Sequence, residues 1–412
     1  MFLANHHMPR MTDRHAILAA TFLRALATGM MGVLLGLYLD RLAYTPTEIG
    51  LVIGAGLAGA ALSAAVVTFF GDALGRRRSL LILSFAAAFG GFALLVSVNL
   101  WVVCGVAFLG MLNGMGRDRG AALVLEQAIL PGIVAPAQRT RAFAGYNVLQ
   151  DFGHALGGLL AALPALTRSL FGIEELVSFQ VAIAVYAVLL LTSTILYLRL
   201  TTTVEAQQVK PALQLAPESR KVLWRISTLF ALDSFAGGFL GTALLAYFFH
   251  MQFGASETAI ALLFFLARTA NAASHFAAAW LAARIGLVNT MVFTHIPSSL
   301  LLMAVPFAPT FGIAAFLFLL RECLVEMDVP TRQSYVMAVV RPEERTMASG
   351  VTHLVRMGGW AVAPLLAGPL MQGLALATPL LVGAGLKIVY DIALYRAFRH
   401  LKPPEEHGNG QK

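Results

Sequence analysis

The chain has 412 residues, of which 58% are hydrophobic and 12% are charged, and its formal net charge is +8. This apolar fraction is far above that of soluble domains, so the composition argues against a soluble globular protein and predicts a membrane protein. The basic residues are scattered between apolar segments, so nucleic acid is not predicted as a partner. Both cysteines, Cys104 and Cys323, lie in apolar segments and indicate neither a disulfide nor a metal site.

Apolar segments long enough to cross a bilayer follow one another along the chain, separated by short polar turns. The first six are expected at residues 16–39, 47–70, 79–98, 101–124, 142–163 and 178–198. The second six are expected at residues 222–249, 257–282, 288–308, 311–330, 346–370 and 374–396. The predicted fold is therefore an all-α membrane protein with twelve transmembrane helices. Its predicted domains are an N-terminal six-helix bundle (1–198), a linker (199–221), a C-terminal six-helix bundle (222–400) and a tail (401–412).

The distribution of basic residues predicts the orientation of the chain in the membrane. Loops on the side of both termini hold 20 of the 29 Lys and Arg residues, whereas the opposite loops hold only Arg41 and Arg168. Because Lys and Arg collect in cytoplasmic loops, both termini are expected to be cytoplasmic in an inner (plasma) membrane protein.

The two sets of segments match one another in sequence. Residues 138–140, Gln-Arg-Thr, match residues 344–346, Glu-Arg-Thr, at an offset of 206, and Gly75 matches Gly286 at an offset of 211. These matches predict two six-helix pseudo-repeats with a substrate site at their interface, near the middle of the membrane.

A motif follows the second predicted helix, in residues 68–80. Its Asp72, Gly75, Arg76 and Arg77 match the pattern G-x-L-x-D-R-x-G-R-K-x-x-L, which resembles the loop motif of the major facilitator superfamily. The resemblance implies a carrier fold over the whole chain. It also implies that these four residues gate the cytoplasmic side by latching onto the eleventh helix. The alternative is that the arginines only anchor the loop in the cytoplasm.

A second motif lies in the fifth predicted helix, at Gly153, Gly157 and Gly158. It resembles the superfamily's exporter motif, which favours efflux, although close packing of helices through small residues explains these glycines equally well.

Ionisable side chains inside the predicted spans are the main candidates for the site. A charge at the bilayer centre costs at least about 2.5 to 3.5 kcal/mol, so such residues are expected to face a cavity or a partner. The predicted substrate-binding residues are Arg24, Asn147, Arg268, Asn271, Arg321 and Arg356. Because four of them are arginines, an anionic or carboxylate substrate is favoured, although drug-like solutes stay open.

Acidic and histidine side chains in the same helices are the predicted proton carriers, since desolvation favours the neutral form of a carboxylate. They are Asp151, His154, Asp233 and Glu322. The competing interpretation is a static salt bridge, for example from Asp233 to Arg24 or Arg268.

Two other pairs of charged residues are predicted to have different roles. Arg117 and Asp118 are predicted to belong to an inner gate, with interfacial snorkelling as the alternative. The resemblance places helices 3, 6, 9 and 12 outermost against lipid. Lys387 and Asp391 in helix 12 depart from this pattern, and their i, i+4 spacing suggests that they neutralise one another.

The predicted function is secondary active transport by alternating access, with proton-coupled efflux of a small organic solute as the favoured form. Uptake or uniport of a small organic anion is the alternative, and a transport-inactive membrane sensor or scaffold is an alternative of another class. No metal, phosphate-loop or nucleophile motif indicates an enzyme, and no cofactor is predicted. The expected partners are the substrate, H+ and the lipid bilayer, and the chain is expected to be a monomer.

Overall fold

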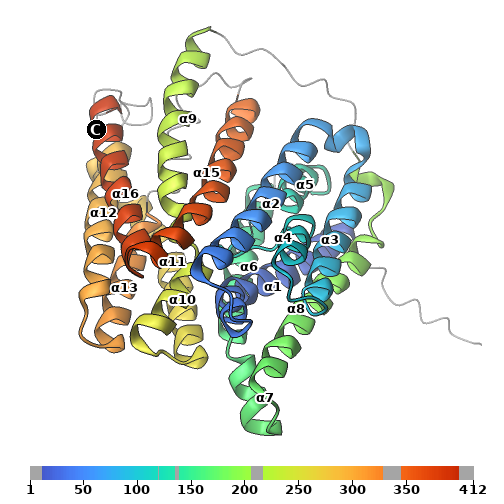
Figure 1. Cartoon of the computed structure of the whole chain (residues 1–412). Helices are drawn as coiled ribbons and strands as arrows, with labels where there is room; N and C mark the ends of the chain where they lie inside the picture. Colours follow the sequence, from blue (N-terminus) through green and yellow to red (C-terminus); the bar gives the residue numbers. More distant parts are fainter. Residues whose placement is uncertain (1–11, 119, 135–138, 206–216, 328–344, 399–412) are drawn as a thin grey trace, which may run out of the picture.

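The computed structural model describes residues 12–118, 120–134, 139–205, 217–327 and 345–398, and these residues form helices joined by short connections (Figure 1). The helices of the N-terminal half, called the N-half below, are α1 (Asp13–Arg41), α2 (Pro46–Leu74), α3 (Arg76–Ala93), α4 (Leu100–Gly110), α5 (Ala121–Ile129), α6 (Arg139–Leu160), α7 (Leu163–Phe171) and α8 (Glu175–Tyr197). Those of the C-half are α9 (Pro217–Gly238), α10 (Thr242–Phe253), α11 (Glu257–Ile285), α12 (Leu287–Ala304), α13 (Phe311–Val325), α15 (Arg345–Gly373) and α16 (Thr378–Phe398).

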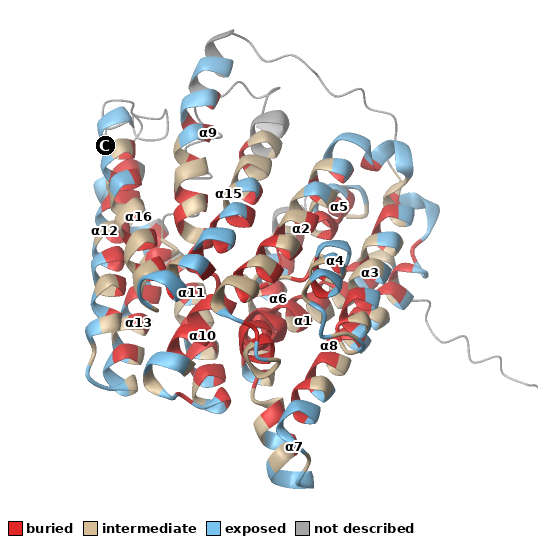
Figure 2. Ribbon diagram, viewed as in Figure 1, coloured by how far each residue is buried: buried red, intermediate tan, exposed pale blue. Residues whose placement is uncertain are grey.

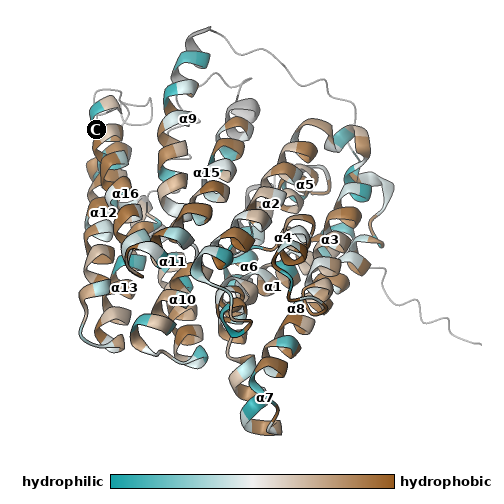
Figure 3. Cartoon of the chain, in the orientation of Figure 1, coloured by the Kyte–Doolittle hydropathy of each residue, from teal (hydrophilic) through white to brown (hydrophobic). Residues whose placement is uncertain are grey.

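Each of the twelve expected spans contains helix, and within the described ranges seven helical segments are long and apolar enough to cross a membrane by themselves. We call the side where α9 begins and α16 ends the terminal face, and the side that carries α7 the far face (Figure 1). The exterior suits lipid, because large apolar side chains such as Phe85, Trp101, Phe293 and Phe316 are exposed there. Brown, hydrophobic ribbon accordingly dominates the outer helices (Figure 3).

Local sequence explains how α2 begins and ends. Thr45 caps its first turn: the hydroxyl accepts from the Glu48 backbone N–H at 3.3 Å, and the Glu48 carboxylate accepts from the Thr45 N–H at 2.8 Å. The helix ends at Gly75, whose φ of +86° lets the chain turn directly into α3. Gly286, between α11 and α12, has a φ of +87°, so the two glycines matched in the sequence also match in conformation.

The fourth and seventh spans were expected to be continuous helices, and this expectation was wrong. Residues 111–120 separate α4 from α5, and residues 239–241 separate α9 from α10. In the first interruption the chain turns through positive φ at Met111 and Gly116. A Cβ on Gly116 would lie 2.7 Å from the Thr242 hydroxyl, so the turn needs glycine for space as well as for its backbone conformation.

The two interruptions meet and satisfy each other's backbone. The Ala243 N–H donates to the Gly114 carbonyl at 2.9 Å, and the Thr242 hydroxyl donates to the Met115 carbonyl at 2.8 Å. Non-helical backbone at membrane depth requires such partners inside the protein, because lipid offers none. The sequence pattern could not predict these breaks, since their partners come from the other half of the chain.

The apolar core shows which face of the molecule is closed. One large cluster toward the far face contains buried residues of both halves, including Met30 and Ile53 from the N-half and Phe248 and Phe318 from the C-half. Toward the terminal face most buried residues, red in Figure 2, belong to two clusters, one in each half, and a small third cluster of Ala60, Met357 and Trp360 joins α2 to α15. Among the described residues, Leu354 is the C-half side chain that packs on the N-half cluster there.

Small residues allow the closest contact between the halves, where α2 and α15 lie against each other. A Cβ on Gly50 would lie 2.3 Å from the Pro364 carbonyl oxygen, and one on Gly368 would lie 2.2 Å from the Pro46 carbonyl oxygen. Backbone atoms cannot yield to a methyl group as a flexible side chain does, so these positions fix the approach of the two helices.

Gly368→Ala should therefore lower the thermal unfolding midpoint of the purified protein in detergent, since overpacking of a tight contact costs about 1 to 3 kcal/mol. Gly358→Ala on the same helix is the matched control, because nothing lies within 4 Å of a Cβ at that position. Equal midpoints for the two variants would contradict the close contact between α2 and α15.

Candidate functional site

A cavity of about 780 Å³, counting the part open to solvent, lies on the terminal-face side of the shared core. Most of its wall belongs to the C-half, and Met115 and Arg117 are its lining residues from the N-half. Its ionisable side chains are Arg117, Asp233, Arg268, His295, Arg321, Glu322, Glu326, Arg356 and Lys387. Five of these are permanent cations and three are carboxylates, so positive charge is in excess.

Asp233 of α9 is the counter-ion of two of these cations. Its carboxylate accepts from the Lys387 ammonium at 2.8 Å and lies 3.8 Å from the Arg356 guanidinium. Arg356 also stacks over the ring of Trp360, with 4.9 Å between the guanidinium carbon and the ring centroid. The sequence suggested Arg24 or Arg268 as the partner of Asp233, and the structure pairs it with Lys387 and Arg356 instead.

Lys387 and Asp391 do not neutralise one another directly, contrary to the i, i+4 expectation. Lys387 turns to Asp233, while Asp391 accepts from Nδ1 of His295 on α12, at 2.9 Å. Each of the two residues pairs with a side chain on a neighbouring helix instead of with the other one on α16. All four side chains are buried. The sequence analysis missed His295, because a single histidine in a helix expected to face lipid gave no signal.

Arg321, Glu322 and Asn271 form a second polar group in the cavity wall. The Arg321 guanidinium pairs with the adjacent Glu322 carboxylate, which also accepts from the Asn271 amide at 2.8 Å. Nε of Arg321 is buried and has no hydrogen-bond partner among the described residues. This buried donor belongs to a side chain of the cavity wall.

Arg268 of α11 lies where the two broken helices meet. Its guanidinium donates to the Thr242 hydroxyl at 3.0 Å and to the Met115 carbonyl at 3.4 Å. No carboxylate of the described part of the chain forms an ion pair with Arg268. The carboxylates of Glu326 and Asp151 act on its charge from beyond the distance of an ion pair.

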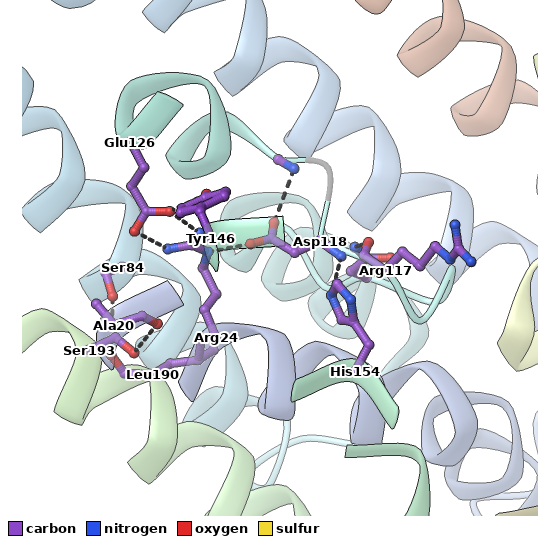
Figure 4. Close-up of polar contacts among 12 residues, drawn as sticks. Ala20, Arg24, Ser84, Arg117, Asp118, Glu126, Tyr146, His154, Leu190 and Ser193 are labelled. Carbon is purple, nitrogen blue, oxygen red and sulfur yellow. Dashed lines mark hydrogen bonds and ion pairs between the residues drawn. The ribbon is translucent and has the colours of Figure 1, made fainter. Parts of the chain in front are cut away.

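Arg24 is placed elsewhere, in a buried network inside the N-half (Figure 4). Its guanidinium binds the Glu126 carboxylate through two hydrogen bonds of 3.0 and 2.5 Å, and it pairs with Asp118. The Tyr146 and Tyr197 hydroxyls donate to the same Glu126 carboxylate at 2.7 and 2.6 Å. Arg24 does not line the central cavity, which corrects the sequence prediction, because two carboxylates take up its donors.

The candidate residues of the fifth predicted span, which is α6, also lie outside the cavity lining. Nε2 of His154 accepts the Asp118 backbone N–H at 2.8 Å, so this ring holds the interrupted segment between α4 and α5 (Figure 4). Asp151 is half-buried and Asn147 is exposed. Gly153 and Gly157 of α6 contact α1, since a Cβ on Gly157 would lie 2.2 Å from the Leu26 carbonyl oxygen, whereas Gly158 faces α11.

The loop motif after α2 makes its described contacts within the N-half. Arg76 pairs with Asp72 at 2.7 Å, and its backbone N–H donates to the Glu205 carboxylate at 2.7 Å. The Arg77 guanidinium donates to the Leu198 carbonyl at 2.8 Å. The Asp72 carboxylate is largely exposed, so it is accessible to another partner.

Ion pairs join the two halves in the cavity wall and at the far face. Arg117 binds Glu326 at 2.8 Å, and both residues line the cavity. At the far face Glu257, at the start of α11, binds Arg168 at 2.9 Å and lies 3.7 Å from Arg41. Sequence reasoning missed Glu257, although Arg41 and Arg168 are the two basic residues expected on that side.

Among the described residues, no group of three or more His, Cys, Asp or Glu side chains is placed to hold a metal ion. The donors of the cavity, which are guanidinium and ammonium groups around a solvent-open hollow, suit a soluble anion.

Comparisons with known proteins agree with this architecture. The family model of the Major Facilitator Superfamily matches residues 17–364. An uncharacterized membrane protein of Saccharomyces cerevisiae, YJR124C, is 23% identical over 416 residues, which cover 93% of this chain and 93% of the yeast protein.

Solved transporter structures share the fold. The nucleoside transporter NupG superposes with a TM-score of 0.73 at 15% identity, covering 94% of this chain and 99% of that one. The human organic anion transporter MFSD10 gives a TM-score of 0.62 at 16% identity, covering 93% and 99%. A bacterial homolog to the human lysosomal transporter Spinster, inward-facing and unoccupied, gives 0.63 at 16% identity, covering 93% and 95%. At these identities the likeness concerns the fold alone.

Proposed function

The chain belongs to the Major Facilitator Superfamily, and from this premise we propose that it carries a small organic anion across the membrane by alternating access. As a member of this family it is a membrane transporter of small solutes. The observation that carries the proposed substrate class is the cavity, where five permanent cations face three carboxylates.

Arg268 is the proposed primary contact for the substrate's negative group. It has no carboxylate partner among the described residues, and it is held in place by the Thr242 hydroxyl and the Met115 carbonyl. A guanidinium held in this way binds a carboxylate or phosphate through two parallel hydrogen bonds. Nε of Arg321, buried and without a partner in the described chain, is a second donor in the same cavity.

The apolar core shared by the halves at the far face and the separate clusters at the terminal face support an inward-facing state, with the terminal face assigned to the cytoplasm from the distribution of basic residues. In this state Glu257 of the C-half holds Arg41 and Arg168 of the N-half, and we assign these three residues to the far-face gate. Opening toward the outside requires these ion pairs to break. The loop motif at Asp72 would then engage the C-half at the terminal face.

Coupling to protons is the second part of the proposal. An anion in the cavity competes with Asp233 for Arg356 and Lys387. The charge of the bound substrate therefore changes how strongly each nearby ionisable group holds its proton. Asp233 serves as the counter-ion that a substrate displaces. Export stays a prediction from the sequence, because the packing of α6 on α1 and α11 explains the glycines that suggested it.

Transport of labelled benzoate, succinate and glucose 6-phosphate into proteoliposomes tests the substrate class, with benzamide and choline as neutral and cationic controls. At least one anion should accumulate above the level of empty liposomes. Arg268→Gln should reduce that uptake at least about tenfold, because a hydrogen bond to a charged group contributes roughly 1.5 to 3 kcal/mol. Arg284→Gln, at an exposed position of the same helix, is the matched control. Accumulation of a control solute without any anion would contradict the proposal.

The far-face gate is tested by the distance between the two halves. Glu257→Gln should shift the population toward the outward-open state, because it removes the charge that holds Arg41 and Arg168. Spin labels at Glu174→Cys and Phe307→Cys, both exposed at the far face, should report longer distances by pulsed electron resonance. The native cysteines at 104 and 323 are replaced by alanine in this experiment.

Glu175→Gln is the control for the gate, since Glu175 binds Arg41 at 2.7 Å within the N-half. Its loss should leave the distance distribution unchanged. Identical distributions for the wild type and Glu257→Gln would remove Glu257 from the gate.

A further inference from the structure

The wall of the cavity formed by α10, α11 and α13 is built from pairs of lining residues that lie one helical turn apart. These pairs are Thr242 and Leu245 on α10, Phe264 and Arg268 on α11, and Phe318 and Arg321 on α13. Residues three or four positions apart share one face of a helix. Each of the three helices therefore presents one polar and one apolar side chain to the cavity.

The directions of the helices place the three apolar side chains at one end of this wall. Helices α11 and α13 run from the far face toward the terminal face, and α10 runs the opposite way (Figure 1). Leu245, Phe264 and Phe318 therefore lie one turn nearer the far face than their polar partners. We call these three residues the apolar floor. Along this wall the cavity changes from cationic to apolar as it deepens.

The core shared by the two halves holds the apolar floor in place. Leu245, Phe264 and Phe318 belong to that core, and the exposed fraction of each is at most 3%. The two rings meet edge to face, with 5.8 Å between their centroids. Because these side chains are packed on their other sides, the surface that they present to the cavity is fixed. It offers a ligand neither a hydrogen-bond donor nor an acceptor.

The cations of this wall lie next to the apolar floor, on its terminal-face side. The guanidinium carbon of Arg321 is 5.6 Å from the centroid of the Phe318 ring. Arg268 follows Phe264 by one turn, and its guanidinium donates to the Thr242 hydroxyl at 3.0 Å. A molecule whose carboxylate binds Arg268 can therefore extend its other end onto the floor.

The opposite wall, formed by α9, α15 and α16, already has its own carboxylate. Asp233 accepts from the Lys387 ammonium at 2.8 Å and lies 3.8 Å from the Arg356 guanidinium. A second carboxylate of a ligand would have to displace Asp233 or lie beside it, and like charges disfavour one another. On the apolar floor that carboxylate would lose its water without gaining a hydrogen bond, which is also unfavourable.

We propose that the substrate is an amphipathic monocarboxylate, with one negative group on an aliphatic or aromatic body, and that it binds with its carboxylate on Arg268 and its body on the apolar floor. This inference rests on the proposed function, because it takes an anion site at Arg268 as its premise. It narrows that function, since dicarboxylates and sugar phosphates are also small organic anions but lack an apolar end.

Calorimetric binding of three matched ligands to the full-length protein in lipid nanodiscs tests the inference at pH 8, where carboxyl groups are ionised. Adipate adds a second carboxylate at the other end of the chain of hexanoate, and hexanamide has no carboxylate. Hexanoate should bind at least about tenfold more tightly than adipate, because the second carboxylate of adipate loses its hydration. It should also bind at least about tenfold more tightly than hexanamide, because Arg268 binds a charged group. Empty nanodiscs correct for partitioning into lipid.

A comparison of butyrate with hexanoate tests the apolar contact in the wild type. Burial of apolar surface on binding gives a negative change in heat capacity. The heat-capacity change should therefore be more negative for hexanoate than for butyrate.

Leu245→Gln tests the position of the apolar floor. The substitution places an amide on the floor, so the preference for hexanoate over adipate should shrink at least about threefold. Met251→Gln, at an exposed position of the same helix, is the matched control and should keep the preference of the wild type.

Several results would overturn this inference and leave the anion site intact. One is adipate binding as tightly as hexanoate, with hexanamide weaker than both. The others are equal heat-capacity changes for butyrate and hexanoate, an unchanged preference in folded Leu245→Gln, or uptake of succinate or glucose 6-phosphate without any binding of hexanoate. Equal binding of hexanoate and hexanamide, or absence of both binding and anion uptake, would overturn the proposed function and this inference with it.

Discussion

Charges buried at membrane depth must find partners inside the protein, and the architecture of this chain depends on how they do so. An isolated charge at the bilayer centre costs at least about 2.5 to 3.5 kcal/mol, so each intramembrane Arg, Lys, Asp or Glu draws its helix toward a partner or toward water. The two halves meet this constraint differently. In the N-half Arg24 is paired with Asp118 and Glu126 beside a cavity with few charged lining residues, whereas in the C-half many charged side chains line the cavity.

This difference separates the structural charges from those that can act on a substrate. The network of Arg24 has two carboxylates for one guanidinium, and two tyrosine hydroxyls complete the bonds of Glu126. The cavity has the opposite balance, because Arg268 lacks a carboxylate partner among the described residues. A half-buried cation without an ion-pair partner is stabilised by a transiently bound anion, and such an anion is a plausible substrate for a carrier. The broken helices beside Arg268 fit the same role, since irregular backbone at membrane depth occurs where it lines a cavity.

Much of the fold could be predicted from the sequence, whereas the pairing within the site could not. Hydropathy placed helix in all twelve expected segments, and the loop motif identified the family that the comparisons confirm. Helical spacing shows which residues share a face, but the partner of a residue depends on which helix that face meets. Asp233 was therefore assigned to Arg24 or Arg268, and Lys387 and Asp391 were paired with one another. The breaks in the fourth and seventh spans were missed for the same reason, because each is satisfied by the other half.

The central claim is that one basic cavity in the C-half binds an organic anion, and a bound heavy atom tests it most directly. Crystals grown with 4-bromobenzoate should give an anomalous peak for bromine inside the cavity, with the carboxylate within hydrogen-bond distance of Arg268. A peak in the N-half near Arg24, or at the lipid-facing surface with the cavity empty, would contradict the account.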